Sequence, residues 1–313
     1  MTPLLPLKTV MIDSDLELLD RDGSILAFNE RVLDWAKRPE VPLLERLRYL
    51  CIVSSNLDEF FEVRADLHMA AYRNSDSKGI YNLKSFEAVY ESARKLVTEQ
   101  YCLYNDVLLP SLEKQKIRIL SHGQRNSAQK KWVQEYFKRE VKPLLVPVGL
   151  DPAHPFPYIS NLALNLAVVA RDPQSGEQRF ARLKIPKNIS RFMRVGSGNK
   201  FVLLEEVVSA NLPRLFQGMV IEQCFVFRVT RNADLSLDDE DAEDLLAALE
   251  MELRRRRFGR AVRLEIPRGT AQETVDLMCE ELELDADDIT YHTGLIEMNA
   301  LNQLASLDLP SLR

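Results

Sequence analysis

Residues 43–64 read LLERLRYLCIVSSNLDEFFEVR, and this stretch decides the fold of the first part of the chain. Its apolar residues recur at helical spacing, at Leu43, Leu44, Leu47, Leu50, Leu57, Phe60 and Phe61. Residues spaced in this way share one face of an α-helix. Three polar residues, Ser54, Ser55 and Asn56, interrupt the apolar run. The stretch therefore predicts amphipathic helix, with an interruption near residue 54.

Helical periodicity extends on both sides of this stretch, over about residues 25–142. A second long helix is expected from about Leu83 to Glu113, and Ser127 is expected to be the N-cap of a third. Helices in series bury their apolar faces on one another, which predicts a small helical bundle. We assign residues 1–24 to an N-terminal extension and residues 25–120 to an N-terminal helical domain.

The character of the sequence changes at Pro143, where the segment PLLVPVGLDPAHPFPYIS begins. Its repeated prolines cannot continue a helix and favour extended or turning backbone. Strand-like runs follow at residues 162–170 and 178–186, and the turn residues between them predict a hairpin. Further strands are expected at residues 221–231 and 261–267, which are rich in β-branched or aliphatic residues.

The run FVLLEEVVSANLPRLF (201–216) is expected to combine a short strand and a helix, and two further helices are expected among the later strands. One runs from Asp238 to Phe258, with acidic residues at its start and arginines at its end. The other follows a capping box formed by Thr270 and Glu273 and ends near Leu284. We therefore assign residues 121–313 to a middle, or head, domain of mixed α/β type. The fold class expected for the chain is multidomain, α + α/β, with an N-terminal helical bundle followed by the head domain.

Composition limits the classes of protein that this chain can belong to. It has 313 residues, 46% hydrophobic and 28% charged, which suits a soluble protein of two domains. The formal net charge of -6 argues against a general nucleic-acid binder. We expect no membrane span, since no run reaches the roughly 18–20 apolar residues that a membrane helix needs. With no convincing signal peptide, we expect a cytoplasmic location.

Cysteines and general catalytic motifs give no sign of a metal centre or an active site. The four cysteines are far apart and have no CxxC spacing, so we expect buried apolar side chains rather than ligands or disulfides. The sequence contains no GxxxxGK[ST], GxGxxG or GxSxG motif. We therefore predict no catalytic residue and no metal ligand in this chain.

Asn56, in the polar interruption of the first helical stretch, has two interpretations. Ser55 or Asn56 can cap a new helix, which the spacing by itself favours. Alternatively, the Asn56 carboxamide can bind a nucleobase, because it donates and accepts hydrogen bonds in one plane.

Three other local features also have alternative interpretations. His154 lies among prolines and suits a rigid loop better than a ligand or proton carrier. Arg228, Arg231 and Asn232 can grip phosphate, or they can form a charged strand end paired with Asp234. The run of arginines at residues 254–257 complements a helix dipole and points in four directions, so a polyanion site is the weaker interpretation.

Three long segments carry a resemblance to a known family. They span residues 28–64, 151–186 and 227–266, and they include SSNLDEFFEVR (54–64), DPAHPFPYIS (151–160) and FRVTRNADLSLDDEDAEDLL (227–246). In this order they resemble the N-terminal and middle (head) domains of polyphosphate kinases of the histidine-autophosphorylating type. The resemblance covers about residues 28–310.

The resemblance implies a function for the whole enzyme and a smaller role for this chain. Such enzymes move the γ-phosphate of ATP through a phosphohistidine onto inorganic polyphosphate, and the asparagine of the SSNLDEF motif reaches the bound ATP. By that match Asn56 is the expected ATP-binding residue. The head domain is implicated in subunit association, so a homo-oligomer is expected. The phosphorylated histidine and the Mg²⁺ ligands are expected in later domains, so we expect this chain to be inactive by itself.

The chain departs from the family pattern at its start. The family opens with RELSWLxFN, whereas residues 21–29 here read RDGSILAFN, with Gly23 in place of a helix former and Ile25 in place of tryptophan. Two further hypotheses therefore remain. One is a stand-alone, non-catalytic assembly or regulatory module, and the other is weak nucleotide binding without catalysis.

Overall fold

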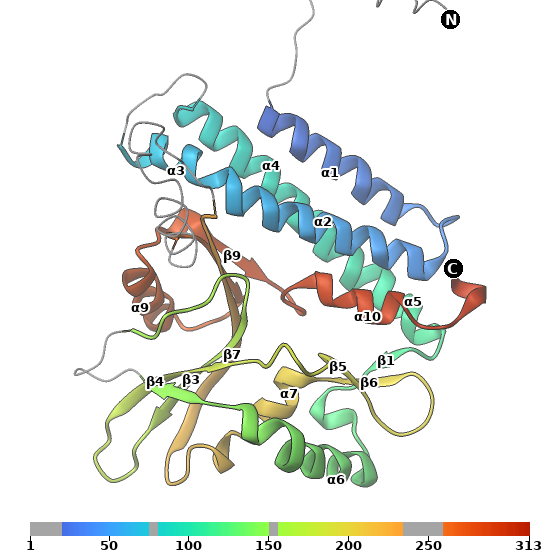
Figure 1. Cartoon of the computed structure of the whole chain (residues 1–313), viewed down its shortest axis with the longest axis vertical. Coiled ribbons are helices and arrows are strands. Elements are labelled where there is room, and N and C mark those ends of the chain that lie inside the picture. Colours follow the sequence, from blue (N-terminus) through green and yellow to red (C-terminus); the bar gives the residue numbers. More distant parts are fainter. Residues whose placement is uncertain (1–20, 75–80, 150–155, 234–258) are drawn as a thin grey trace, which may run out of the picture.

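The computed structural model describes residues 21–74, 81–149, 156–233 and 259–313. A layer of long helices lies against a domain built on a six-stranded sheet, and the end of the chain returns to the helices (Figure 1). The expected fold class, an N-terminal helical bundle followed by a mixed α/β head domain, is confirmed. The expected helix at residues 238–258 lies outside the described residues.

The helical part consists of α1 (Arg21–Lys37), α2 (Leu43–Val63), α3 (Ala65–Asn74) and α4 (Leu83–Cys102). A π-helical turn (Leu103–Leu108) joins α4 to α5 (Leu109–Lys114), so the long helix expected from Leu83 to Glu113 is present. Helix α2 runs without a break through Ser54, Ser55 and Asn56. The cap interpretation of Asn56 is therefore wrong, because the backbone there is helical on both sides and has no helix start to cap.

The apolar face expected for α2 forms much of the first core. Leu44, Leu47, Leu50, Leu57 and Phe60 are each at most 2% exposed. They pack with residues of α1 and α4, and also with Met298, Leu301 and Leu304 from the end of the chain. The helix α10 (Asn302–Ala305) thus lies along α2, as Figure 1 shows. The helical core is therefore completed by a segment some 250 residues away in the sequence.

The head domain is built on a sheet with the strand order β2-β4-β3-β7-β8-β9. These strands are β2 (Pro147–Gly149), β4 (Gln178–Lys184), β3 (Leu164–Arg171), β7 (Val220–Arg231), β8 (Ala261–Pro267) and β9 (Ile289–His292). All neighbours are antiparallel except β8 and β9, which are parallel and connected through α9 (Gln272–Leu282). The hairpin expected from the two strand-like runs is β3–β4.

A smaller sheet links the two parts of the chain. It contains β1 (Arg118–Ile119), β6 (Lys200–Leu203) and β5 (Phe192–Arg194), in that order. The helix α6 (Ser127–Tyr136) and the short helix α7 (Leu204–Ser209) belong to a second core with β3 and β4. Phe137, which follows α6 directly, is fully buried there.

Three local expectations need correction. The N-cap of α6 is Asn126 rather than Ser127, since the Asn126 side chain accepts the backbone N–H of Gln129 at 2.9 Å. The Thr270 hydroxyl donates to the Pro267 carbonyl, so no capping box forms ahead of α9. Cys51 is buried as expected, whereas Cys102 is exposed. No helix among the described residues is long and apolar enough to cross a membrane.

Candidate functional site

Asn56 lies in a cavity of about 550 Å³ beside α1 and α2, which we call the α1–α2 cavity. Its wall includes Arg21, Ile25, Phe28, Asn56, Glu59 and Arg64. Phe28 is 51% exposed, and the Arg31 guanidinium lies over its ring at 5.9 Å from the centroid, so part of the ring remains accessible to a ligand. Helical geometry explains the arrangement, because residues three and four apart on each helix face the same side.

Asn29 holds Asn56 in place from the neighbouring helix. The Asn56 Nδ2 donates to the Asn29 Oδ1 at 2.8 Å, and Asn29 is fully buried. The Asn56 side chain forms no other hydrogen bond with the residues that the structure describes. Its carboxamide oxygen and second N–H are therefore left for a ligand. Asn29 was not predicted as a site residue from the sequence, although it is the last residue of the segment RDGSILAFN (21–29), which corresponds to the opening motif of the family.

Two arginines, Arg21 and Arg64, and one carboxylate, Glu59, line the α1–α2 cavity. Arg21 forms no ion pair with any described residue, and Arg64 Nε lies 3.6 Å from Asp22 Oδ1. The other oxygen of Asp22 lies 2.9 Å from His68 Nε2 in the interior. Guanidinium groups bind phosphate oxygens well because they present several donors in a fixed plane. An anion with an aromatic part thus matches the cavity better than a neutral apolar ligand.

The opposite face of α2 is fixed to the head domain by a buried cluster of charges, the Asp58 network. Asp58 accepts from Arg228 Nη1 and Nη2 at 2.8 and 2.7 Å, and from Arg263 Nη2 at 2.8 Å. Glu265 accepts from Arg228 Nε at 2.5 Å, and its other oxygen lies 3.0 Å from His292 Nε2. The side chains are at most 11% exposed. Two arginines and two carboxylates thus balance their charges across the junction of the domains.

The ionisation of this network follows from its geometry. Burial would raise the pKa of Glu265, but Arg228 and Arg263 together hold that pKa well below its usual range. Burial likewise opposes the charge of Arg228, yet Glu265 and Asp58 raise its pKa well above the ordinary value. Glu265 and Arg228 therefore stabilise each other's charged form, and the network as a whole fixes the orientation of the helix that carries Asn56.

The structure settles part of the phosphate interpretation of residues 228–232. Arg228 is committed to Asp58 and Glu265, so it is not a free phosphate ligand. Arg231 donates to the carbonyls of Ile159 and Gly259 and stacks on Tyr158, while Asn232 donates to Asp66. Asp234, His154 and the arginines at 254–257 lie outside the described residues. In the part of the chain that is described, no group of three His, Cys, Asp or Glu side chains is arranged to hold a metal ion.

Fold and site together define a two-domain protein with a helical domain fixed to a mixed-sheet head domain and an anion-compatible cavity on the helical side. Two family descriptions match it, "Polyphosphate kinase N-terminal domain" over residues 18–120 and "Polyphosphate kinase middle domain" over residues 128–304. The chain belongs to the polyphosphate kinase family.

Individual relatives agree with this assignment. A polyphosphate kinase of Thermosynechococcus vestitus is 40% identical over 318 residues, which cover 96% of this chain and 43% of the relative. One from Streptomyces coelicolor is 39% identical over 299 residues, covering 94% and 40%. The crystal structure of polyphosphate kinase from Porphyromonas gingivalis superposes with a TM-score of 0.76 at 25% identity, covering 95% of this chain and 42% of that one. The chain thus spans about two fifths of the length of these relatives.

Proposed function

We propose that this chain forms one wall of the ATP site and the assembly scaffold of an ATP:polyphosphate phosphotransferase. The observation that carries the proposal is the position of Asn56, which lines an open cavity instead of being enclosed by packed helices. Its free acceptor and donor suit the edge of a nucleobase. The family membership makes ATP and inorganic polyphosphate the substrates to test first.

The residues of the α1–α2 cavity have separate roles in this proposal. Asn56, held by Asn29, orients the base, and the half-exposed ring of Phe28 provides a surface for stacking. Arg21 and Arg64 supply positive charge to the wall of the cavity. The chain therefore binds and orients ATP.

The transfer itself is assigned to residues outside this chain. The γ-phosphoryl group leaves ATP as ADP is formed, bonds to a histidine, and then bonds to the terminal phosphate of polyphosphate as the histidine is released. Mg²⁺, held by ligands outside this chain, would supply positive charge beside the phosphoryl group together with cationic side chains. The histidine and the Mg²⁺ ligands are the groups that the family resemblance implies for later domains.

ATP binding to the 313-residue chain tests the role of Asn56. We expect weak binding, because phosphate contacts carry most of the charge-assisted hydrogen bonds. Asn56→Ala should weaken it about tenfold, the size of one or two lost hydrogen bonds. Asn302→Ala removes an exposed asparagine on α10 that does not line the cavity, and should leave the affinity unchanged. Equal affinity of the Asn56→Ala variant and the unmodified chain would remove Asn56 from the site.

The scaffold role is tested by self-association. We propose a cytoplasmic homo-oligomer assembled through the head domain. Sedimentation velocity over a range of concentrations should show a species heavier than the 35.9 kDa chain. A monomer at every concentration would contradict this part of the proposal and leave the ATP wall unaffected.

A further inference from the structure

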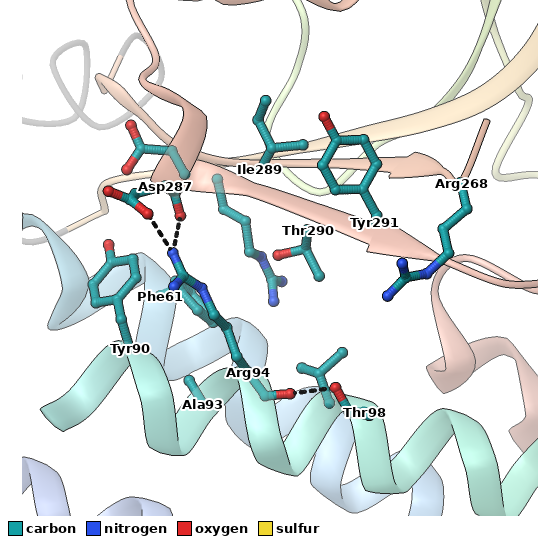
Figure 2. A pocket seen from close by; sticks show the side chains of 13 residues that line it. Phe61, Tyr90, Ala93, Arg94, Thr98, Arg268, Asp287, Ile289, Thr290 and Tyr291 are labelled. Carbon is teal, nitrogen blue, oxygen red and sulfur yellow. Dashed lines mark hydrogen bonds and ion pairs between the residues drawn. The ribbon is translucent and has the colours of Figure 1, made fainter. Parts of the chain in front are cut away.

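A second cavity, of about 240 Å³, lies between the helical domain and the edge of the head sheet, and we call it the α4–β9 cavity (Figure 2). Helix α4 forms one wall and strand β9 the other. It shares no lining residue with the α1–α2 cavity. It is smaller than the roughly 300–1,000 Å³ of sites that enclose a drug-sized ligand. It therefore suits a ligand smaller than ATP.

The charges of this cavity are paired except at one end. Arg94 Nη2 donates to Asp287 at 2.7 Å, Arg73 pairs with Asp288, and Arg263 belongs to the Asp58 network. Arg268 is exposed, and its guanidinium forms no ion pair or hydrogen bond with the residues that the structure describes. After pairing, one positive charge thus remains on the cavity wall.

Figure 2 shows that the unpaired positive charge lies at one end of the cavity. The guanidinium of Arg268 lies at one end, and Asp287 lies at the other, next to Tyr90. The Tyr90 side chain is 4% exposed, and its hydroxyl has no hydrogen-bond partner among the described residues. A buried hydroxyl without a partner is costly, and a polar atom of a ligand would satisfy it. The wall also includes the apolar side chains of Ala93, Val97 and Ile289.

We propose that the α4–β9 cavity binds a nucleoside monophosphate, at a site separate from the α1–α2 cavity. The phosphate group is placed at Arg268, because a guanidinium matches phosphate oxygens and no carboxylate competes at that end. The base lies on the apolar wall and directs its polar edge to the opposite end, where the Tyr90 hydroxyl can donate a hydrogen bond and the Asp287 carboxylate can accept one. Because the cavity lies between α4 and β9, the ligand would contact both domains at once.

Ligand-observed NMR and titration calorimetry on the 313-residue chain, with AMP as the probe, test this site. AMP should bind more tightly than adenosine and more tightly than inorganic phosphate, because the site contacts both the phosphate group and the nucleoside. Equal affinity for adenosine would show that Arg268 is not used, and equal affinity for phosphate would show that the apolar wall is not used. Either result, or no binding of AMP, overturns the proposal.

Variants separate this site from the α1–α2 cavity. Arg268→Gln should weaken AMP binding at least tenfold, as expected for the loss of a charged hydrogen-bond donor. Thr98→Trp places a bulky side chain into the cavity from the exposed face of α4 and should abolish AMP binding. Arg118→Gln, at an exposed arginine of β1, is the matched control and should have no effect.

The same titrations distinguish failure here from failure of the proposed function. Asn56→Ala should leave AMP binding in the α4–β9 cavity unchanged, and Arg268→Gln should leave ATP binding in the α1–α2 cavity unchanged. If AMP affinity falls in Asn56→Ala and not in Arg268→Gln, AMP occupies the α1–α2 cavity. That outcome overturns the second site and supports the first.

Discussion

Replacing Asp58 by alanine should destabilise the chain by about 3–5 kcal/mol, the usual cost of removing one partner from a buried ion pair. Asp58 accepts three hydrogen bonds from Arg228 and Arg263, all between 2.7 and 2.8 Å. Without it, two buried guanidinium groups share one carboxylate, Glu265. The desolvated positive charge that remains unbalanced accounts for most of the loss.

Urea unfolding followed by circular dichroism measures this loss. Asp34→Ala is the matched control, because Asp34 forms a surface ion pair with Lys37 at 3.1 Å and is 57% exposed. Such a pair contributes about 0–1 kcal/mol, so the control should unfold close to the unmodified chain. Asp58→Asn keeps the shape of the side chain and should give a folded variant. Its loss in free energy of unfolding should lie between those of Asp34→Ala and Asp58→Ala.

A double replacement separates the cost of an unpaired charge from the value of the network. Asp58→Leu with Arg228→Met removes one charge of each sign and leaves Arg263 with Glu265. We expect this variant to be more stable than Asp58→Ala, because apolar residues of similar volume can replace a buried pair at little cost. If Asp58→Ala loses no more stability than Asp34→Ala, the account of the Asp58 network is refuted.

Three further predictions concern pH, helix capping and activity. Burial raises the pKa of Asp288 to about 6, so between pH 4 and 6 the folded chain holds a proton that the unfolded chain lacks, and stability falls as pH rises through this interval. Urea titrations at several pH values should show that the free energy of unfolding of the unmodified chain falls over this interval, and that this fall is absent in Asp288→Asn. If the free energies of the two proteins differ by the same amount at every pH, the prediction is contradicted. Asn126→Ala should lower the free energy of unfolding by about 1 kcal/mol, because the capping box of α6 is lost. Ser127→Ala should lower it less. If thermal unfolding shows the same loss of stability in both variants, the observed cap is contradicted. The purified 313-residue chain should convert no ATP to polyphosphate in a radiolabel assay, and turnover abolished by a point change within it would show that these residues include catalytic groups.

The elements of this protein were predictable wherever the signal was local. Apolar spacing in α2 and α4 and the β-branched run of β7 depend on neighbours within a few residues, and each is present in the structure. The errors were also local, at positions where several polar residues compete. Ser127 and Asn126 can both cap α6, and Ser54 to Asn56 are tolerated inside a helix whose apolar face is buried. Asn56 became a site candidate through the family resemblance, since its spacing favoured a cap.

Sequence alone thus determined the helical and mixed α/β regions and the family, because helical and strand periodicity and ordered motifs are written in consecutive residues. Only the tertiary structure decided which residues meet. Asn56 contacts Asn29, Asp58 contacts Arg228 from 170 positions away, and α10 completes the core beneath α2. Buried charges and cavities form where segments that are distant in the sequence pack against one another and exclude water. Which residues pair or line a cavity therefore depends on packing and not on sequence spacing.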